Sequence, residues 1–325
     1  MKWLLVMSFG FLLALPVVAF AVWTRVATGE ETTYGDDDRP RVLLVGNSFF
    51  REHDLAAMVG HLSESSGAVR PLSVTSLTRD GATLTDFASR WLVTRRFDDG
   101  WRTVVLHGEG FQAVTDYAGY VEAGTSLAAG IRRGAARPIL YTTAAYRADE
   151  PRMTALTSPV ATAIVQDVIM NANIDVARRS GATVSFGGAA LSWCEHVRPT
   201  AGGPTKSFYA DDGIHPSLLG SYLMAWAILR LADEKVPAPD GPWWKPDELT
   251  NDEAAWIRRC ASDAPRFGLP PRPAAAPPAT EEPASAADDE AASAEKASKR
   301  SRRRHARRRR SRTPKKVPAP RKLSR

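Results

Sequence analysis

A serine, an aspartate and a histidine stand in this sequence at positions where folding can bring them together. Ser48 follows the short apolar run Val42–Val45, where a buried strand would turn into a helix. Far downstream, Asp212-Gly-Ile-His215-Pro places a carboxylate three residues before an imidazole. A serine hydroxyl becomes a nucleophile when an imidazole accepts its proton, and a carboxylate holds that imidazole in the required tautomer. The three side chains therefore predict the catalytic parts of a serine hydrolase.

The Asp212–His215 segment is expected to lie in the loop before a helix, because Pro216 suits the first turn of a helix. At this spacing the carboxylate can meet Nδ1 of His215 and leave Nε2 free to face Ser48. Two simpler interpretations stay open: Ser48 is an ordinary helix N-cap, or Asp212-Gly is a surface turn beside an incidental histidine. Their occurrence together, in the first and last strand-to-helix connections, favours the catalytic interpretation.

Alternating short apolar runs and longer helical patterns predict the elements that position these residues. The predicted strands are Val42–Val45, Leu72–Val74, Thr103–Leu106, Ile139–Thr142 and Thr183–Phe186. The predicted helices are Arg51–Ser65, Leu84–Val93, Tyr117–Arg133, Val160–Ser180, Pro216–Ala232 and Asp252–Ala261. Strands separated by helices need crossover connections, so we expect an α/β fold with a parallel sheet covered on both faces. Ligands of such sheets bind beyond the carboxyl ends of the strands, where Ser48, Gly81, Glu109 and Tyr146 would lie.

The sequence resembles the SGNH (GDSL-type) hydrolase superfamily over about residues 40–265, in short blocks. Gly46-Asn47-Ser48-Phe resembles the first block, in the variant with Asn in place of the usual Asp before the serine. Arg79-Asp80-Gly81-Ala82 resembles the second block, whose glycine N–H helps to bind the oxyanion. Asp212-Gly-Ile-His215-Pro matches the last block closely. The resemblance implies a flavodoxin-like three-layer sandwich with a five-stranded parallel sheet. It also implies hydrolysis of ester-linked acyl groups, often acetyl groups on carbohydrate, with no metal or other cofactor.

The third block departs from the family pattern, because the usual Gly-x-Asn-Asp appears here as His107-Gly-Glu109-Gly. Glu109 stands where the family's oxyanion-stabilising Asn would be, and an ionised carboxylate cannot donate a hydrogen bond. Three explanations are open: a protonated Glu109, a nearby donor such as Gln112 or His107, or a damaged catalyst. A shift of one or two residues in the match is a fourth. The predicted oxyanion hole therefore consists of the N–H groups of Ser48 and Gly81, with Glu109 as its unexplained third member.

The N-terminal residues predict export. Trp3 to Trp23 is an uncharged, mostly apolar run of 21 residues after Lys2, close to the ~20 residues that cross a bilayer as a helix. The run is longer than the usual core of a signal peptide, yet Ala19-Phe-Ala fits a cleavage site. Residues 1–23 are thus a signal peptide or an N-terminal membrane anchor. Both interpretations place the following part in the periplasm or outside the cell.

The remaining chain divides by composition. Residues 24–39 are predicted to be a polar linker, 40–268 the SGNH hydrolase-like domain, and 269–325 a disordered tail, Ala/Pro-rich and then Arg/Lys-rich. Residues 296–325 hold 16 Lys and Arg residues and no acid, whereas the other 27 basic residues are outnumbered by 36 acidic ones. Outside the cytoplasm we expect this tail to bind anionic envelope polymers or lipid headgroups rather than nucleic acid. A solvated extension without a partner is the alternative.

Two further sets of residues are left with two interpretations each. Cys194 and Cys260 are the only cysteines; in an oxidising compartment they can form a disulfide, and two unpaired buried thiols are the alternative. Four other side chains are candidates for the substrate cleft, with core packing as the alternative: Tyr146, Arg147, Trp193 and Tyr209.

Together these patterns favour an exported serine esterase that removes acyl groups, acetyl groups among them, from a carbohydrate or small ester. In this interpretation Ser48 is the nucleophile, His215 the base and Asp212 the residue that orients the base. One alternative is a binding module of the cell envelope on the same fold, catalytically impaired through Glu109. Another is an acyltransferase that uses the same triad. The sequence leaves the oligomeric state open.

Overall fold

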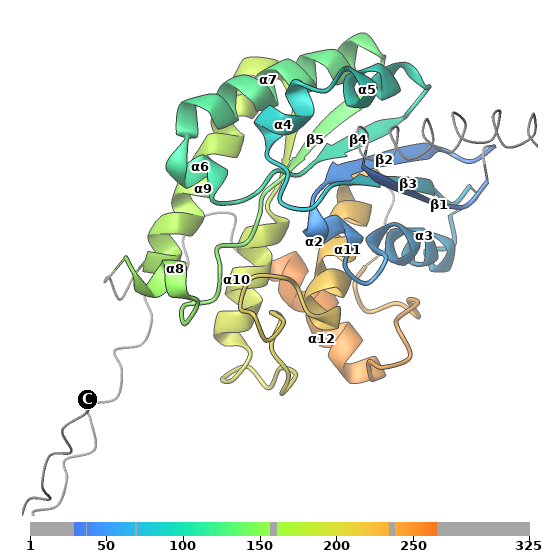
Figure 1. The fold of residues 1–325 in the computed structure, drawn as a ribbon. Coiled ribbons are helices and arrows are strands. Elements are labelled where there is room, and N and C mark those ends of the chain that lie inside the picture. Colours follow the sequence, from blue (N-terminus) through green and yellow to red (C-terminus); the bar gives the residue numbers. More distant parts are fainter. Residues whose placement is uncertain (1–28, 37, 69, 157–160, 234–237, 265–325) are drawn as a thin grey trace, which may run out of the picture. The chain divides into compact units, whose positions relative to one another are not determined.

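The computed structural model describes residues 29–36, 38–68, 70–156, 161–233 and 238–264. A central six-stranded sheet lies between two layers of helices (Figure 1). Its strand order is β1-β3-β2-β4-β5-β6, and β1 alone runs antiparallel to its neighbour. The strands are β1 Glu30–Tyr34, β2 Arg41–Gly46, β3 Ser73–Thr78, β4 Thr103–Leu106, β5 Arg137–Tyr141 and β6 Thr183–Ser185. The predicted α/β class and the parallel arrangement of the five predicted strands are confirmed.

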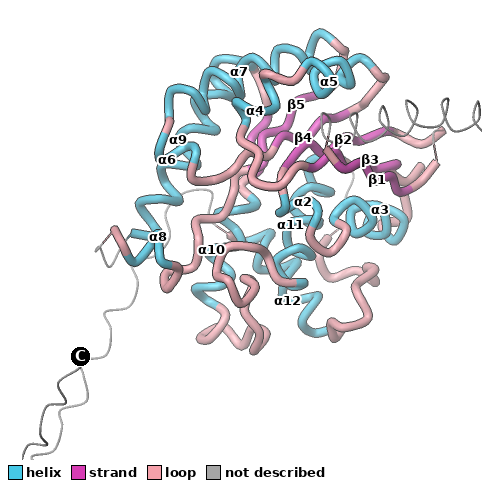
Figure 2. Tube along the Cα trace, viewed as in Figure 1, coloured by secondary structure: helices cyan, strands magenta, loops and turns pink. Residues whose placement is uncertain are grey.

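Helices cover both faces of the sheet, as Figure 2 shows in cyan. One face carries α7 Tyr117–Arg133 and α9 Ala161–Ser180, with the shorter α4 Leu84–Ala88, α5 Trp91–Thr94, η1 Arg95–Asp98, α6 Gln112–Thr115 and α8 Pro151–Thr154. The other face carries α3 Leu55–Ser65 and α11 Leu218–Ala232, with α2 Ser48–Arg51, α10 Gly187–Val197 and α12 Asn251–Asp263. Strands covered on both faces must be apolar throughout, and Val42–Val45 of β2 are fully buried.

The sheet has one strand more than predicted, because part of the expected linker 24–39 forms β1. Glu30–Tyr34 pairs antiparallel with β3, from Glu30 beside Thr78 to Tyr34 beside Val74. Its sequence Glu-Glu-Thr-Thr-Tyr has almost no apolar side chain, since the strand lies at the sheet edge and most of it is exposed. Tyr34 provides the attachment: its ring packs against Gly60 and its hydroxyl donates to Glu64.

The predicted helix Arg51–Ser65 is wrong as a single element. His53 and Asp54 adopt left-handed conformations, with φ of 55° and 49°, and separate the one-turn α2 from α3. Asp54 then caps α3 by accepting a hydrogen bond from the backbone of Ala57 at 3.2 Å. The predicted helix Leu84–Val93 is likewise divided, into α4 and α5. Apolar periodicity continues across both breaks, so the pattern alone does not reveal them.

The order of the five parallel strands places the candidate site at a topological switch point. Chain connections leave β2 toward β3 on one side and later return to β4 on its other side. Ligands of open α/β sheets bind in the crevice at such a point, beyond the carboxyl ends of the strands. Ser48 follows β2, Gly81 follows β3 and Glu109 follows β4, so the fold brings the three predicted blocks to this crevice.

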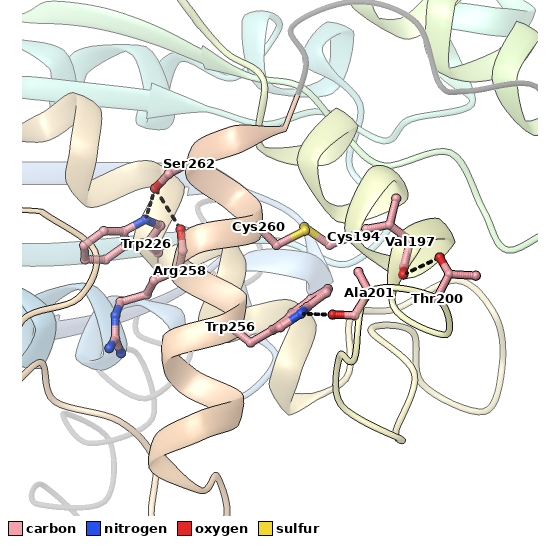
Figure 3. Close-up of a disulfide and its surroundings, with 9 residues drawn as sticks. All are labelled: Cys194, Val197, Thr200, Ala201, Trp226, Trp256, Arg258, Cys260 and Ser262. Atoms are coloured by element: carbon pink, nitrogen blue, oxygen red, sulfur yellow. Dashed lines mark hydrogen bonds between the residues drawn. A yellow bond between two sulfur atoms is a disulfide. The ribbon is translucent and has the colours of Figure 1, made fainter.

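A disulfide joins two helices on the face of the sheet that carries α11. Cys194 of α10 and Cys260 of α12 are bonded, which resolves the alternative left open by the sequence (Figure 3). Beside it, the indole N–H of Trp256 donates to the carbonyl of Ala201 at 3.1 Å. The bond links residues 66 positions apart, so it ties the last described helix to the domain.

None of the described helices combines the length and apolar character needed to cross a membrane. The apolar run Trp3–Trp23 and the tail 269–325 lie outside the described residues. Their predicted roles therefore stay predictions.

Candidate functional site

Ser48 is the first residue of α2, at the turn that follows β2. Asn47 is the N-cap: its side-chain oxygen accepts a hydrogen bond from the backbone N–H of Phe49 at 3.1 Å. The hydroxyl of Ser48 is therefore not needed as a cap. It lies 2.9 Å from Nε2 of His215, across 167 positions of sequence.

The imidazole of His215 is held from its other side by Asp212. Nδ1 of His215 lies 2.6 Å from one carboxylate oxygen of Asp212. The other oxygen accepts the backbone N–H groups of Ile214, at 2.9 Å, and His215, at 3.0 Å. Partial burial opposes ionisation of Asp212, but these hydrogen bonds outweigh it and the pKa of Asp212 is lowered. An Nδ1–H tautomer satisfies both contacts of the ring, and Nε2 then accepts the proton of Ser48.

The loop that carries Asp212 and His215 is a tight turn on the path into α11. Gly213 has a φ of 70°, a conformation that favours glycine. The backbone N–H of Ala210 donates to the carbonyl of His215 at 2.8 Å, which closes the turn. Ser217 caps α11, which begins at Leu218, so Pro216 lies just before the helix and not in its first turn as predicted. The Asp-x-x-His spacing is thus realised in a closed loop at the start of a helix.

On the side where the sequence predicts an oxyanion hole, Gly81 lies in the turn after β3. Its φ is 63°, and the space beside its Cα is open. The turn is joined to the first block because the N–H of Arg79 donates to the carbonyl of Gly46 at 3.0 Å. Arg51 of α2 forms an ion pair with Asp80 at 2.5 Å. Within the described part of the chain, the backbone N–H groups of Ser48 and Gly81 have no hydrogen-bond acceptor.

Glu109 is anchored to the same edge but its carboxylate is already engaged. Its backbone N–H donates to the carbonyl of Ala82 at 3.1 Å, which places the third block beside the second. One carboxylate oxygen accepts the backbone N–H of Gln112 at 2.8 Å, and the other accepts the hydroxyl of Tyr146 at 2.5 Å. Burial, and then the hydrogen bond to Glu109, raise the pKa of Tyr146, so its hydroxyl stays a donor. Glu109 therefore serves as a hydrogen-bond acceptor.

The two substitute donors that the sequence suggested are directed elsewhere. His107 is fully buried and stacks on Phe50, and its Nε2 lies 3.0 Å from the hydroxyl of Thr143. Burial lowers the pKa of His107 to about 3, so the ring is neutral. The amide of Gln112 accepts the N–H of Leu84 at 2.9 Å and donates to Thr85 at 2.6 Å. Neither side chain replaces the missing donor at Glu109.

A cleft of about 660 Å³ borders the imidazole side of the site. Most of the residues that line it are polar or charged, and both signs of charge are present. The lining residues are Glu52, His53, Arg147, Lys206, Ser207, Tyr209, Ala210, Asp211, Asp212, His215, Pro216, Ser217 and Leu218. Of the four cleft candidates from the sequence, Arg147 and Tyr209 line it, whereas Tyr146 and Trp193 do not. Sequence reasoning missed Glu52, His53 and Lys206. These residues belong to no motif, and only the folded chain brings them to the same cleft.

Within the described residues, no group of three or more His, Cys, Asp or Glu side chains is arranged to hold a metal ion. The side chains of Asp212, His215 and Ser48 form a linear series of hydrogen-bond contacts.

Comparison with known proteins gives similarity of fold. No family model matches the sequence, and no curated protein matches it. Among solved structures, a DUF4886 family protein from Bacteroides uniformis matches with a TM-score of 0.55 and 15% identity, over 70% of this chain and 95% of that one. A candidate SGNH hydrolase from Slackia heliotrinireducens matches with a TM-score of 0.48 and 24% identity, over 59% and 98%. An acetylxylan esterase from Geobacillus stearothermophilus matches with a TM-score of 0.45 and 17% identity, over 61% and 95%.

Proposed function

We propose that this protein is a serine esterase in which Ser48, His215 and Asp212 form the catalytic triad. The observation that carries the proposal is the continuous series of contacts from the carboxylate through the imidazole to the hydroxyl, 2.6 Å and 2.9 Å long. Nucleophile, base and orienting acid within hydrogen-bond reach are the geometric signature of this chemistry. Because the contact between Ser48 and His215 joins residues 167 positions apart, proximity along the chain does not explain it.

The reaction follows from the geometry. His215 Nε2 removes the hydroxyl proton while Oγ of Ser48 attacks the ester carbonyl carbon. The oxyanion that forms is stabilised by the free N–H groups of Ser48 and Gly81. His215 then returns the proton to the leaving alcohol oxygen, which breaks the ester bond and leaves an acyl group on Ser48. Water, deprotonated by His215, attacks this acyl-enzyme and releases the acid.

The cleft favours a hydrophilic alcohol as the leaving group. It borders His215, the residue that must protonate the leaving oxygen, so the alcohol part of the ester belongs on this side. Its volume of about 660 Å³ fits a ligand of several hundred daltons. The polar side chains in its lining supply hydrogen-bond partners for the hydroxyl groups of such an alcohol. We therefore propose an acylated carbohydrate or a small polar ester as substrate.

We further propose that the protein is exported. The Cys194–Cys260 disulfide supports this location, because structural disulfides persist in oxidising compartments. The apolar run ends six residues before β1, and β1 starts beside Thr78, at the carboxyl edge of the sheet. From Trp23 to Glu30 the chain makes seven residue steps, which span at most about 25 Å. A retained anchor would therefore hold the candidate site close to the bilayer, and N-terminal sequencing of the membrane fraction separates it from a cleaved signal.

The decisive test is the replacement Ser48→Ala in the full chain, with p-nitrophenyl acetate as substrate. Loss of the nucleophile should lower kcat by at least ~10⁴-fold. Ser126→Ala, at an exposed serine of α7, is the matched control and should keep the wild-type rate. A fluorophosphonate probe should label wild-type protein at Ser48 and leave the Ser48→Ala variant unlabelled. Wild-type activity in Ser48→Ala would reject the proposal.

The second candidate function is a binding module on the same fold. The observation that favours it is Glu109, whose carboxylate accepts hydrogen bonds where the family has a donor. In this case wild-type protein would neither turn over p-nitrophenyl acetate nor react with the probe, yet would retain acetylated oligosaccharides in a binding assay. Transfer of the acyl group to a sugar, the remaining alternative, would appear as an acylated acceptor among the products.

A further inference from the structure

Three consecutive residues after β5 contact both sides of the candidate site. The carbonyl of Ala145 accepts a hydrogen bond at 2.6 Å from the hydroxyl of Tyr209, which lines the cleft. Tyr146 donates to Glu109 on the oxyanion side. Arg147 contacts the loop that carries the triad acid and base. This segment, Ala145–Arg147, therefore links the oxyanion side of the site to the imidazole side.

Arg147 is bonded to the backbone on both sides of Asp212. Its N–H donates to the carbonyl of Gly213 at 2.8 Å. Its guanidinium donates to the carbonyls of Ala210 at 3.2 Å and Asp211 at 3.3 Å. The same group is fixed in turn by Asp149, which lies 2.6 Å from Nε.

The triad acid depends on such external support because burial does not confine it. The side chain of Asp212 is 45% exposed, and that of His215 is 32% exposed. The turn contains Gly213, which has no side chain to restrict its backbone conformation. The hydrogen bonds within the turn fix its shape, but they do not fix its place relative to the sheet. Arg147 connects the turn to the loop after β5, and so to the framework that holds Ser48.

We propose that Arg147 is a positioning residue for the triad, which holds the Asp212–His215 turn so that Nε2 stays within reach of Ser48. The inference rests on the proposed function and adds a residue that no sequence motif contains. Arg147 contacts neither the serine nor the imidazole, so its effect passes through the backbone of the turn. An arginine suits this role because its planar fork serves two carbonyls and one carboxylate at once, which a lysine ammonium on a flexible stem does not.

The test compares Arg147→Ala and Arg147→Lys with a matched control, Arg198→Ala. Arg198 makes the same type of contact, to the carbonyls of Pro204 and Thr205 and to Glu195, but outside the triad turn. With p-nitrophenyl acetate, Arg147→Ala should lower kcat by about 10- to 100-fold with little change in KM, as expected when a catalytic group is displaced by about 1 Å. Arg147→Lys should restore only a small part of the rate. Arg198→Ala should retain the wild-type kcat.

A double-mutant cycle separates positioning from general destabilisation. In the His215→Ala background, Arg147→Ala should cause less than about a twofold further loss, because the base that it positions is no longer present. A loss of the same factor in both backgrounds, or a wild-type kcat in Arg147→Ala, would overturn the inference. The proposed function fails differently: wild-type protein would then be inactive and unlabelled by the fluorophosphonate probe.

Discussion

The two sides of the candidate site differ in how their chemistry is encoded. On the imidazole side, Asp212 and His215 are three residues apart and lie in one turn, and their contact follows from local geometry. On the oxyanion side, Glu109 meets Tyr146 and Gln112, and two different loops must be placed for these contacts to form. The first side has the arrangement that the motif predicts. The second uses a residue that the family pattern does not contain.

This difference indicates which part of the site is free to vary. An imidazole must receive its proton from one hydroxyl and be oriented by one acceptor, so few arrangements work. An oxyanion accepts any preorganised N–H donor, and the backbone groups of Ser48 and Gly81 already provide two. In the proposed reaction these two N–H groups would stabilise the oxyanion, and the third position could then hold an acceptor.

The largest effect is expected from Asp212→Asn. Asn at this position favours the wrong tautomer of His215, and kcat for p-nitrophenyl acetate should fall by about 10⁴-fold with little change in KM. Asp247→Asn is the matched control, because Asp247 is exposed and lies outside the cleft, and its carboxylate has no hydrogen-bond partner in the described chain. A loss below tenfold in Asp212→Asn would show that the orienting acid is dispensable.

A smaller effect is expected on the pH dependence of stability, through the buried histidine His107. Burial lowers the pKa of His107 to about 3, from 6.5 in the unfolded chain. Between these values the unfolded state binds a proton that the folded state does not, so stability is complete above about pH 6.5 and falls as the pH decreases. From pH 7 to pH 5 this group should lower the free energy of unfolding by about 2 kcal/mol.

Urea unfolding of wild type and His107→Gln at both pH values measures this contribution. The pH-dependent loss should be about 2 kcal/mol smaller in His107→Gln than in wild type. His196→Gln, at a half-buried histidine of α10, is the control for the loss of an imidazole elsewhere in the domain. Equal pH dependence in wild type and His107→Gln would mean that His107 binds a proton in the folded state.

The smallest effect is expected from Glu109→Gln. Gln keeps an acceptor oxygen for Tyr146 or for the N–H of Gln112, and no oxyanion donor is lost, so kcat should change by less than tenfold. Loss of a true oxyanion donor costs about 10²–10³-fold, and a fall of that size would assign Glu109 to the oxyanion hole. A rise above tenfold would show instead that the carboxylate repels the oxyanion. Tyr146→Phe, which removes one partner of Glu109, is the companion variant and should also stay within tenfold.

Sequence reasoning succeeded where a pattern is local and continuous. The helix Tyr117–Arg133 and the strand Thr103–Leu106 have the predicted bounds, because apolar periodicity and burial agree over their whole length. It failed where a tertiary contact overrides the pattern. His53 is left-handed in the turn before α3, and its ring meets Ser221 of α11 at 2.9 Å. Strand β1 exists because β3 offers a free edge, a property that Glu30–Tyr34 does not display by itself.

The sequence by itself determined the class of the fold, the order of its parallel strands along the chain, and the three residues of the proposed triad. These follow from hydrophobic periodicity and from short spacings, which act within one element or one turn. Only the tertiary structure decided that Ser48 meets His215, that Glu109 is held by Tyr146, and that Arg147 supports the turn of Asp212. Such contacts join separate loops at one edge of a sheet, and their distances depend on how the whole sheet and its helices pack.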